Sequence, residues 1–229
     1  MSRHTSARLP TLASSEVAIP PLGLVGTLNV PKDPIGLVVF AHGSGSSRHS
    51  PRNTAVARAL NGHGFATLLF DLLTPQEESD RANVFDISML AGRLAEAVQW
   101  LHGQRELVAS LPVGLFGAST GAAAALVAAA RLPDRISAVV SRGGRPDLAG
   151  DALPMVRAPT LLIVGGADFQ VIELNQEAFS RLRAPKALEI VEDATHLFPE
   201  PGAMDAVIKY AAAWFELHLR RLPRSLVPE

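Results

Sequence analysis

One serine in this chain lies in a setting that suggests chemistry, within the stretch Pro112–Arg131. The stretch reads PVGLFGASTGAAAALVAAAR, which is a short apolar run, a turn at residues 117–121 and an alanine-rich segment typical of a buried helix. At such a junction the chain passes close to itself, so the positions two before and two after the serine must lack a side chain. The helix start stabilises an anion that forms there. Ser119 is therefore predicted to be a nucleophile.

A serine hydroxyl attacks poorly at neutral pH, so it needs a base within hydrogen-bond reach. Downstream of Ser119 the sequence holds only two histidines, His196 and His218. His218 falls inside the predicted closing helix, whereas His196 lies in a loop just after a predicted strand. The base is therefore predicted to be His196.

The base in turn needs an acid to orient it, which in the chain order serine–acid–histidine falls between Ser119 and His196. Asp168 follows an apolar strand and a Gly-Gly bend directly, and we expect it to be that acid. Asp147, which lies in a longer loop after the previous strand, is the alternative. Asp71 also ends a strand, but it precedes the serine and is predicted to be a loop cap.

Acyl transfer also requires donors for the developing oxyanion. We expect one to be the backbone N–H of Thr120, the residue after the nucleophile. The second is predicted in the glycine- and serine-rich loop HGSGSS, where the amide of Ser44 is preferred and that of Gly45 is the alternative. His42, which opens this loop, is predicted to shape it, because its place in the chain order does not suit a base.

Apolar strands and helices alternate along the chain, which predicts an α/β fold: a mostly parallel central sheet with helices on both faces. The predicted strands span residues 16–19, 24–30, 36–41, 65–70, 113–116, 136–140, 159–164 and 187–191. The remaining predicted helices span residues 51–61, 84–102, 173–182 and 204–219. Sites in such sheets form at the carboxyl ends of the strands, and all four loops that hold the predicted site residues follow strand ends.

The 229 residues suit a single domain, predicted over residues 16–222, with a flexible arm at 1–15 and a tail at 223–229. The net charge is −1, which gives no reason to expect a nucleic acid or a membrane surface as partner. No apolar run reaches the roughly 18 residues of a membrane span, and no secretion signal is evident, so a cytoplasmic location is expected. The absence of cysteine excludes a thiol nucleophile and disulfides.

The set HGSGSS, GASTG, GGAD and DATH resembles the α/β-hydrolase superfamily over residues 17–219. The short chain without a large cap domain is similar to the dienelactone hydrolase family. That family proper uses a cysteine nucleophile, so Ser119 makes this chain resemble a serine carboxylesterase more closely. The resemblance implies no cofactor, and no histidine pair has the spacing of a metal site. A cofactor-free haloperoxidase, an acyltransferase or a non-catalytic binding protein of the same fold stay open as alternatives.

Two arginine clusters lie near predicted strand ends and could select the substrate. The first follows the HGSGSS loop and holds Arg48, His49 and Arg52, and in the second Arg142 and Arg145 flank a Gly-Gly pair. Arg48 and Arg142 are the ones chosen as contacts. A guanidinium matches a carboxylate, so both arginines are candidate contacts for an anionic ester. The alternative is that they pair with acids of the protein. The short connection at residues 71–83 predicts an open site that suits small or flexible esters.

Overall fold

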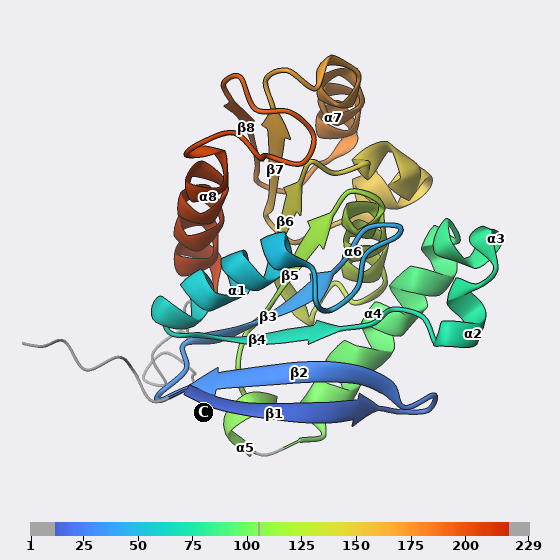
Figure 1. Ribbon diagram of the computed structural model, residues 1–229, viewed down its shortest axis with the longest axis vertical. Coiled ribbons are helices and arrows are strands. Elements are labelled where there is room, and N and C mark those ends of the chain that lie inside the picture. The colour runs from blue at the N-terminus through green and yellow to red at the C-terminus, as the bar shows by residue number, and fades with distance from the viewer. Residues whose placement is uncertain (1–11, 105, 220–229) are drawn as a thin grey trace, which may run out of the picture.

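The computed structural model describes residues 12–104 and 106–219, which fold around one eight-stranded sheet with the order β1-β2-β4-β3-β5-β6-β7-β8 (Figure 1). The strands are β1 (Leu12–Ile19), β2 (Leu24–Pro31), β3 (Gly36–Ala41), β4 (Phe65–Phe70), β5 (Val113–Ala118), β6 (Ile136–Arg142), β7 (Thr160–Gly165) and β8 (Lys186–Val191). The pairs β1–β2 and β2–β4 are antiparallel, and all other neighbours are parallel. The predicted mostly parallel sheet is confirmed.

Helices cover both faces of this sheet. They are α1 (Pro51–Gly62), α2 (Pro75–Glu78), α3 (Arg81–Val84), α4 (Ile87–His102), α5 (Glu106–Ala109), α6 (Thr120–Arg131), α7 (Phe169–Arg181) and α8 (Ala203–His218), with a 3-10 segment η1 at Pro146–Met155. The apolar core on one face is built with α1 and α8, and the core on the other face with α4, α6 and α7. Within the described ranges, no helix is long and apolar enough to cross a bilayer.

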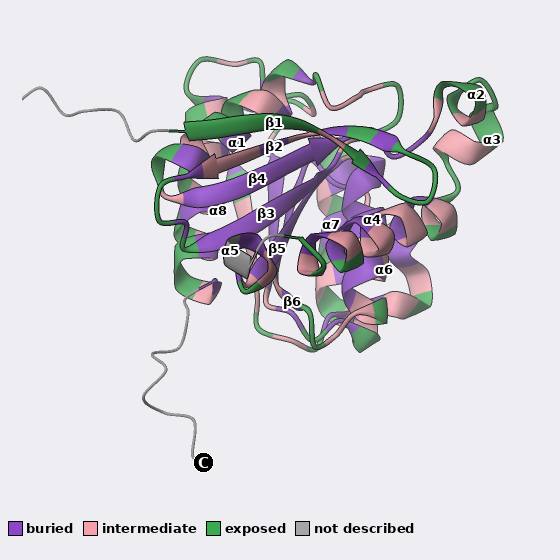
Figure 2. Cartoon of the chain, turned by 90° about the horizontal axis from the view of Figure 1, so that it is seen from below, coloured by how far each residue is buried: buried purple, intermediate pink, exposed green. Residues whose placement is uncertain are grey.

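The burial of the central strands explains why their positions could be predicted from the sequence. Every residue of β3, β4, β5 and β7 is buried, and Figure 2 shows β3 and β4 in the colour of buried residues. Strands covered on both faces carry continuous apolar runs instead of alternating ones. The successive residues of β3 therefore feed the two separate cores, with Val39 in one and Val38 and Phe40 in the other.

Two predicted helix starts are wrong by three residues or more. The helix predicted from residue 84 begins at Ile87, because the Asp86 side chain accepts a hydrogen bond from the Met89 N–H at 2.9 Å and caps it. The connection predicted at residues 71–83 contains the short helix α2 and most of α3, which ends at Val84. The helix predicted from residue 173 begins earlier, at Phe169, directly after Asp168.

The N-terminal strand also starts earlier than predicted. β1 pairs with β2 from Leu12, opposite Pro31, to Ile19, opposite Leu24. Residues 12–15 of the predicted arm therefore belong to the sheet. Residues 1–11 of that arm and the predicted tail at 223–229 lie outside the described residues.

Candidate active site

Ser119 lies on the tight turn between β5 and α6, in a backbone conformation that side chains rarely adopt. Its φ is 51° and its ψ is −124°. A Cβ on Gly117 would lie 2.4 Å from the Cα of Ala122, and one on Gly121 would lie 2.3 Å from the carbonyl oxygen of Ala41. The close approach expected from the two glycines is present, and it holds the serine at the carboxyl end of the central strand.

We expect Gly121→Ala to destabilise the fold by about 1–3 kcal/mol or more, because the new methyl group must displace the backbone that follows β3. Denaturant unfolding measures this loss, together with a loss of activity as the HGSGSS loop shifts. Gly62→Ala is the matched control, since no atom lies within 4 Å of its Cβ position at the end of α1. Equal stability of the two variants would show that the approach at Gly121 is not restrictive.

The predicted base and acid meet in the structure. The Nδ1 of His196 lies 2.7 Å from the Oδ2 of Asp168, which leaves Nε2 as the nitrogen for proton transfer. The alternative acid Asp147 instead accepts two hydrogen bonds from Arg145, at 2.8 and 2.9 Å. His218 packs against Trp214 on α8, with ring centroids 4.5 Å apart. Among the candidates, only Asp168 holds the histidine.

Ser119 and His196 line one cavity of about 230 Å³, which we call the nucleophile cavity. No hydrogen bond joins the Ser119 hydroxyl to the His196 ring in this structure; such bonds often tighten only when substrate is bound. The other residues lining this cavity are Gly43, Ser44, Ser46, Ser50, Arg52, Asn53, Ala118, Arg142, Gly143 and Leu197. The cavity is therefore polar and strongly basic beside the nucleophile.

A second cavity of about 160 Å³ adjoins the HGSGSS loop and is lined by that loop, by Thr120 and several leucines, and by charged residues that include Arg48, Asp71 and Glu78. We call it the apolar cavity. Its apolar wall consists of Leu72, Leu73, Val84 and Leu90. The two cavities share Gly43, Ser44 and Ser46. The site thus offers a basic compartment and a second compartment with an apolar wall, and both are lined by residues of one loop.

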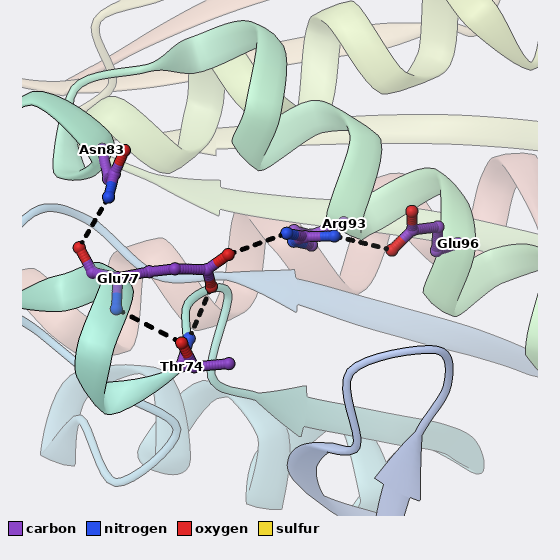
Figure 3. A network of polar contacts seen from close by, with 5 residues as sticks. All are labelled: Thr74, Glu77, Asn83, Arg93 and Glu96. Carbon is purple, nitrogen blue, oxygen red and sulfur yellow. Dashed lines mark hydrogen bonds and ion pairs between the residues drawn. The ribbon is translucent and has the colours of Figure 1, made fainter.

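The helices α2, α3 and α4, which contribute Pro75, Glu78, Val84 and Leu90 to the lining of the apolar cavity, are joined by a polar network (Figure 3). The Glu77 carboxylate accepts hydrogen bonds from the Thr74 N–H and from the Arg93 guanidinium, both at 2.9 Å. Asn83 donates to the carbonyl oxygen of Glu77 at 2.9 Å. The hydrogen bond from Thr74 and the nearby Arg93 guanidinium lower the pKa of Glu77. α2 and α3 are thereby fastened to α4 as a fixed wall.

The two predicted oxyanion donors lie beside each other, but one of them is engaged. Thr120 is the first residue of α6, so its N–H has no carbonyl partner within the helix. The Ser44 N–H donates to the Thr120 hydroxyl at 3.0 Å. The Thr120 hydroxyl therefore occupies the Ser44 N–H in this structure, and the role of Ser44 as an oxyanion donor stays a prediction.

His42 ties two loops of the site together. The Leu72 N–H donates to its Nε2 at 3.1 Å, so its proton lies on Nδ1, which donates to the Gly43 carbonyl at 3.0 Å. This is the neutral form of the ring, and burial lowers the pKa of His42. The arrangement agrees with a loop-shaping role.

Protonation of His42 is expected to destabilise the fold. Its folded-state pKa lies below its ordinary value of 6.5, so the unfolded chain binds this proton more tightly. The free energy of unfolding should fall as the pH drops below about 6.5 and level off, for this group, below the folded-state pKa. His42→Gln, which keeps an acceptor for Leu72, should flatten this slope in unfolding experiments from pH 7 to 5. An unchanged slope would contradict the assignment.

The two candidate arginines differ sharply in their surroundings. Arg48 forms an ion pair with Asp71, whose carboxylate also accepts the Arg48 N–H at 2.8 Å. Its charge is thus compensated, and the expected substrate contact is not supported for it. Arg142 ends β6 and projects into the nucleophile cavity with only 5% of its surface exposed.

Arg52, which belongs to the first arginine cluster but was not chosen there as a contact, also lines the nucleophile cavity. It lies in the first turn of α1, next to Asn53, whose Oδ1 accepts a hydrogen bond from Arg142 at 3.3 Å. The sequence signal was available, since Arg52 follows the HGSGSS loop by only a few residues. It could not be told from Arg48 without knowing which arginine pairs with an acid.

Comparisons with known proteins assign this chain to a family. The family model described as the alpha/beta hydrolase fold matches residues 36–160. The crystal structure of a dienelactone hydrolase from Anabaena variabilis ATCC 29413 is 52% identical, covers 93% of this chain and 100% of its own, and superposes with a TM-score of 0.87. Est1E from Butyrivibrio proteoclasticus, at 17% identity and a TM-score of 0.73 over 89% of this chain and 97% of its own, shares the fold.

Two curated relatives from Mycobacterium tuberculosis, strains CDC 1551 and H37Rv, are 60% identical over 212 residues and carry the provisional name phosphoribosyl transferase. The match covers 92% of this chain and 48% of theirs, so the chain spans about half the length of these relatives. The chain belongs to the alpha/beta-hydrolase family, among its dienelactone hydrolase-like members.

Proposed function

We propose that this chain is a serine hydrolase that cleaves a carboxylic ester through an acyl-enzyme intermediate. One observation carries the proposal: Ser119, on its strained turn, shares a cavity with His196, whose Nδ1 lies 2.7 Å from the Asp168 carboxylate. A nucleophile, a base and an orienting acid are the three parts that activate a serine.

In the proposed reaction the Ser119 Oγ attacks the ester carbonyl carbon while the Nε2 of His196 takes its proton. Asp168 stabilises the imidazolium through Nδ1. The Thr120 N–H at the start of α6 donates to the oxyanion, and Ser44 joins it once its N–H turns from the Thr120 hydroxyl. His196 then returns the proton to the leaving alcohol. Water, activated by the same histidine, releases the acid and regenerates the serine.

The similar structures support this reading, since one is a dienelactone hydrolase. The transferase name of the curated relatives belongs to proteins about twice as long as this chain, and we propose no phosphoribosyl transfer for it. A haloperoxidase or an acyltransferase on the same residues would differ only in the nucleophile that removes the acyl group.

The test is covalent labelling combined with turnover. The purified protein is incubated with a fluorophosphonate probe and, separately, with p-nitrophenyl acetate, and the labelled peptide is identified by mass spectrometry. We expect ester turnover and an adduct on Ser119. An adduct elsewhere would refute the nucleophile. Neither labelling nor turnover of any short-chain ester would favour a non-catalytic binding protein. Faster acyl transfer to an added alcohol or to peroxide than to water would favour the transferase or haloperoxidase reading.

A further inference from the structure

We propose that Arg52 and Arg142 form a subsite for a dianionic group beside Ser119, and that the substrate is a short ester bearing a phosphate monoester. The inference rests on the proposed function for the ester part and on the basic half of the nucleophile cavity for the anionic part. It concerns the two arginines that the catalytic steps do not use.

Arg142 is a buried cation without an acid. The residue is 5% exposed. Its guanidinium donates to the neutral Asn53 oxygen at 3.3 Å and lies over the Phe198 ring with its Cζ 5.9 Å from the centroid. Its buried Nε has no hydrogen-bond partner. Burial, reinforced by the charge of Arg52, lowers the pKa of Arg142 to about 10, so it stays charged at neutral pH. A buried charge kept without a counter-ion is costly unless a ligand supplies one.

Arg52 brings a second uncompensated charge to the same cavity. It stands in the first turn of α1, and its Nε is also buried without a hydrogen-bond partner. In the part of the chain that the structure describes, no carboxylate lies within ion-pair distance of Arg52 or Arg142. The acid of the site, Asp168, is already held by His196. The two guanidiniums therefore need an external anion.

The start of α1 adds to this positive field. Ser50, which caps the 12-residue helix, lines the nucleophile cavity together with Arg52 and Asn53, so the helix presents its first turn there. The N-terminus of a helix acts as roughly half a positive charge and is a ready site for phosphate. Two guanidiniums and a helix start thus converge on one anionic ligand.

The charge count favours a dianion over a carboxylate. A phosphate monoester carries about −1.5 to −2 charges near pH 7 and offers three acceptor oxygens, which suit two forked guanidiniums. A single carboxylate would leave one buried arginine uncompensated. The cavity of about 230 Å³ also contains Ser119, so only a short linker separates the phosphate from the ester carbonyl.

The test compares three acetate esters that differ in one group: 2-acetoxyethyl phosphate, acetoxyacetate and neutral 2-hydroxyethyl acetate. Acetate release is measured with wild type, Arg52→Gln, Arg142→Gln and the control Arg145→Gln, whose side chain is paired with Asp147. We expect wild type to prefer the phosphate over the neutral ester by about 100-fold in kcat/KM, with the carboxylate between them. Each cavity variant should lower the phosphate-to-neutral ratio about tenfold or more, and the control should keep it.

The outcomes separate this subsite from the proposed function. Equal turnover of all three esters would overturn the subsite and leave the esterase intact, and preference for the carboxylate would overturn the phosphate assignment. If no ester is turned over, the proposed function fails, and calorimetric titration with inorganic phosphate decides on the subsite. Binding that Arg52→Gln abolishes supports it, whereas no binding, or binding that survives, overturns it. Arg52 is partly exposed on α1, so this variant serves even if Arg142→Gln does not fold.

Discussion

Replacement of Ser119 by alanine is expected to lower kcat for p-nitrophenyl acetate by about 10⁴-fold or more, with little change in KM. Without the hydroxyl no acyl-enzyme forms, and only the oxyanion donors and the bound geometry still favour attack by water. The cavity itself is preserved, because alanine removes only one oxygen atom from the turn. The backbone keeps its φ of 51° and its contacts with the same neighbours. Steady-state kinetics and fluorophosphonate labelling measure the effect together.

The matched control is Ser46→Ala, which removes a hydroxyl that lines the same cavity but follows the turn at Gly45. It should keep turnover within a few-fold of wild type and keep the label. Labelling or turnover that persisted in Ser119→Ala would contradict the assignment of Ser119 as the nucleophile. A comparable loss in Ser46→Ala would mean that the cavity wall, and not one nucleophile, limits the reaction.

The elements that hold the site could be predicted from the sequence where burial on both faces requires apolar residues. β3 and β4 have the bounds that their continuous apolar runs predict, since both faces of these strands are covered. The start of α4 could not be read in this way, because apolar residues continue back to Val84. The helix start is set by a single side-chain hydrogen bond from Asp86.

The same distinction applies to the candidate site. Ser119, Asp168 and His196 were singled out because each follows an apolar run that ends at the same edge of a parallel sheet. Which arginine is free was beyond the sequence, because the Arg48–Asp71 pair joins residues 23 apart across two loops. The engagement of the Ser44 N–H by the Thr120 hydroxyl, across 76 residues, is of the same kind. Side-chain pairing over long separations is a property of the folded chain alone.

Asp168→Asn is expected to lower kcat by about 10⁴-fold while leaving the fold intact. The 2.7 Å contact lets the carboxylate accept the Nδ1 proton and stabilise the imidazolium as Ser119 loses its proton. A neutral amide stabilises that cation far less. It can also donate its own N–H to Nδ1, which moves the ring proton to Nε2 and removes the acceptor that Ser119 needs.

Asp147→Asn separates this effect from the loss of any acid near the site. Asp147 lies after the neighbouring strand β6, but its carboxylate is held by Arg145 at 2.8 and 2.9 Å and not by the histidine. Its replacement should change kcat no more than a few-fold. Which variant loses more kcat, Asp168→Asn or Asp147→Asn, decides the assignment, because the chain order of serine, acid and histidine is compatible with both aspartates. A larger loss in Asp147→Asn would transfer the orienting role to it, and the Asp168–His196 contact would then be only a link between the loops after β7 and β8.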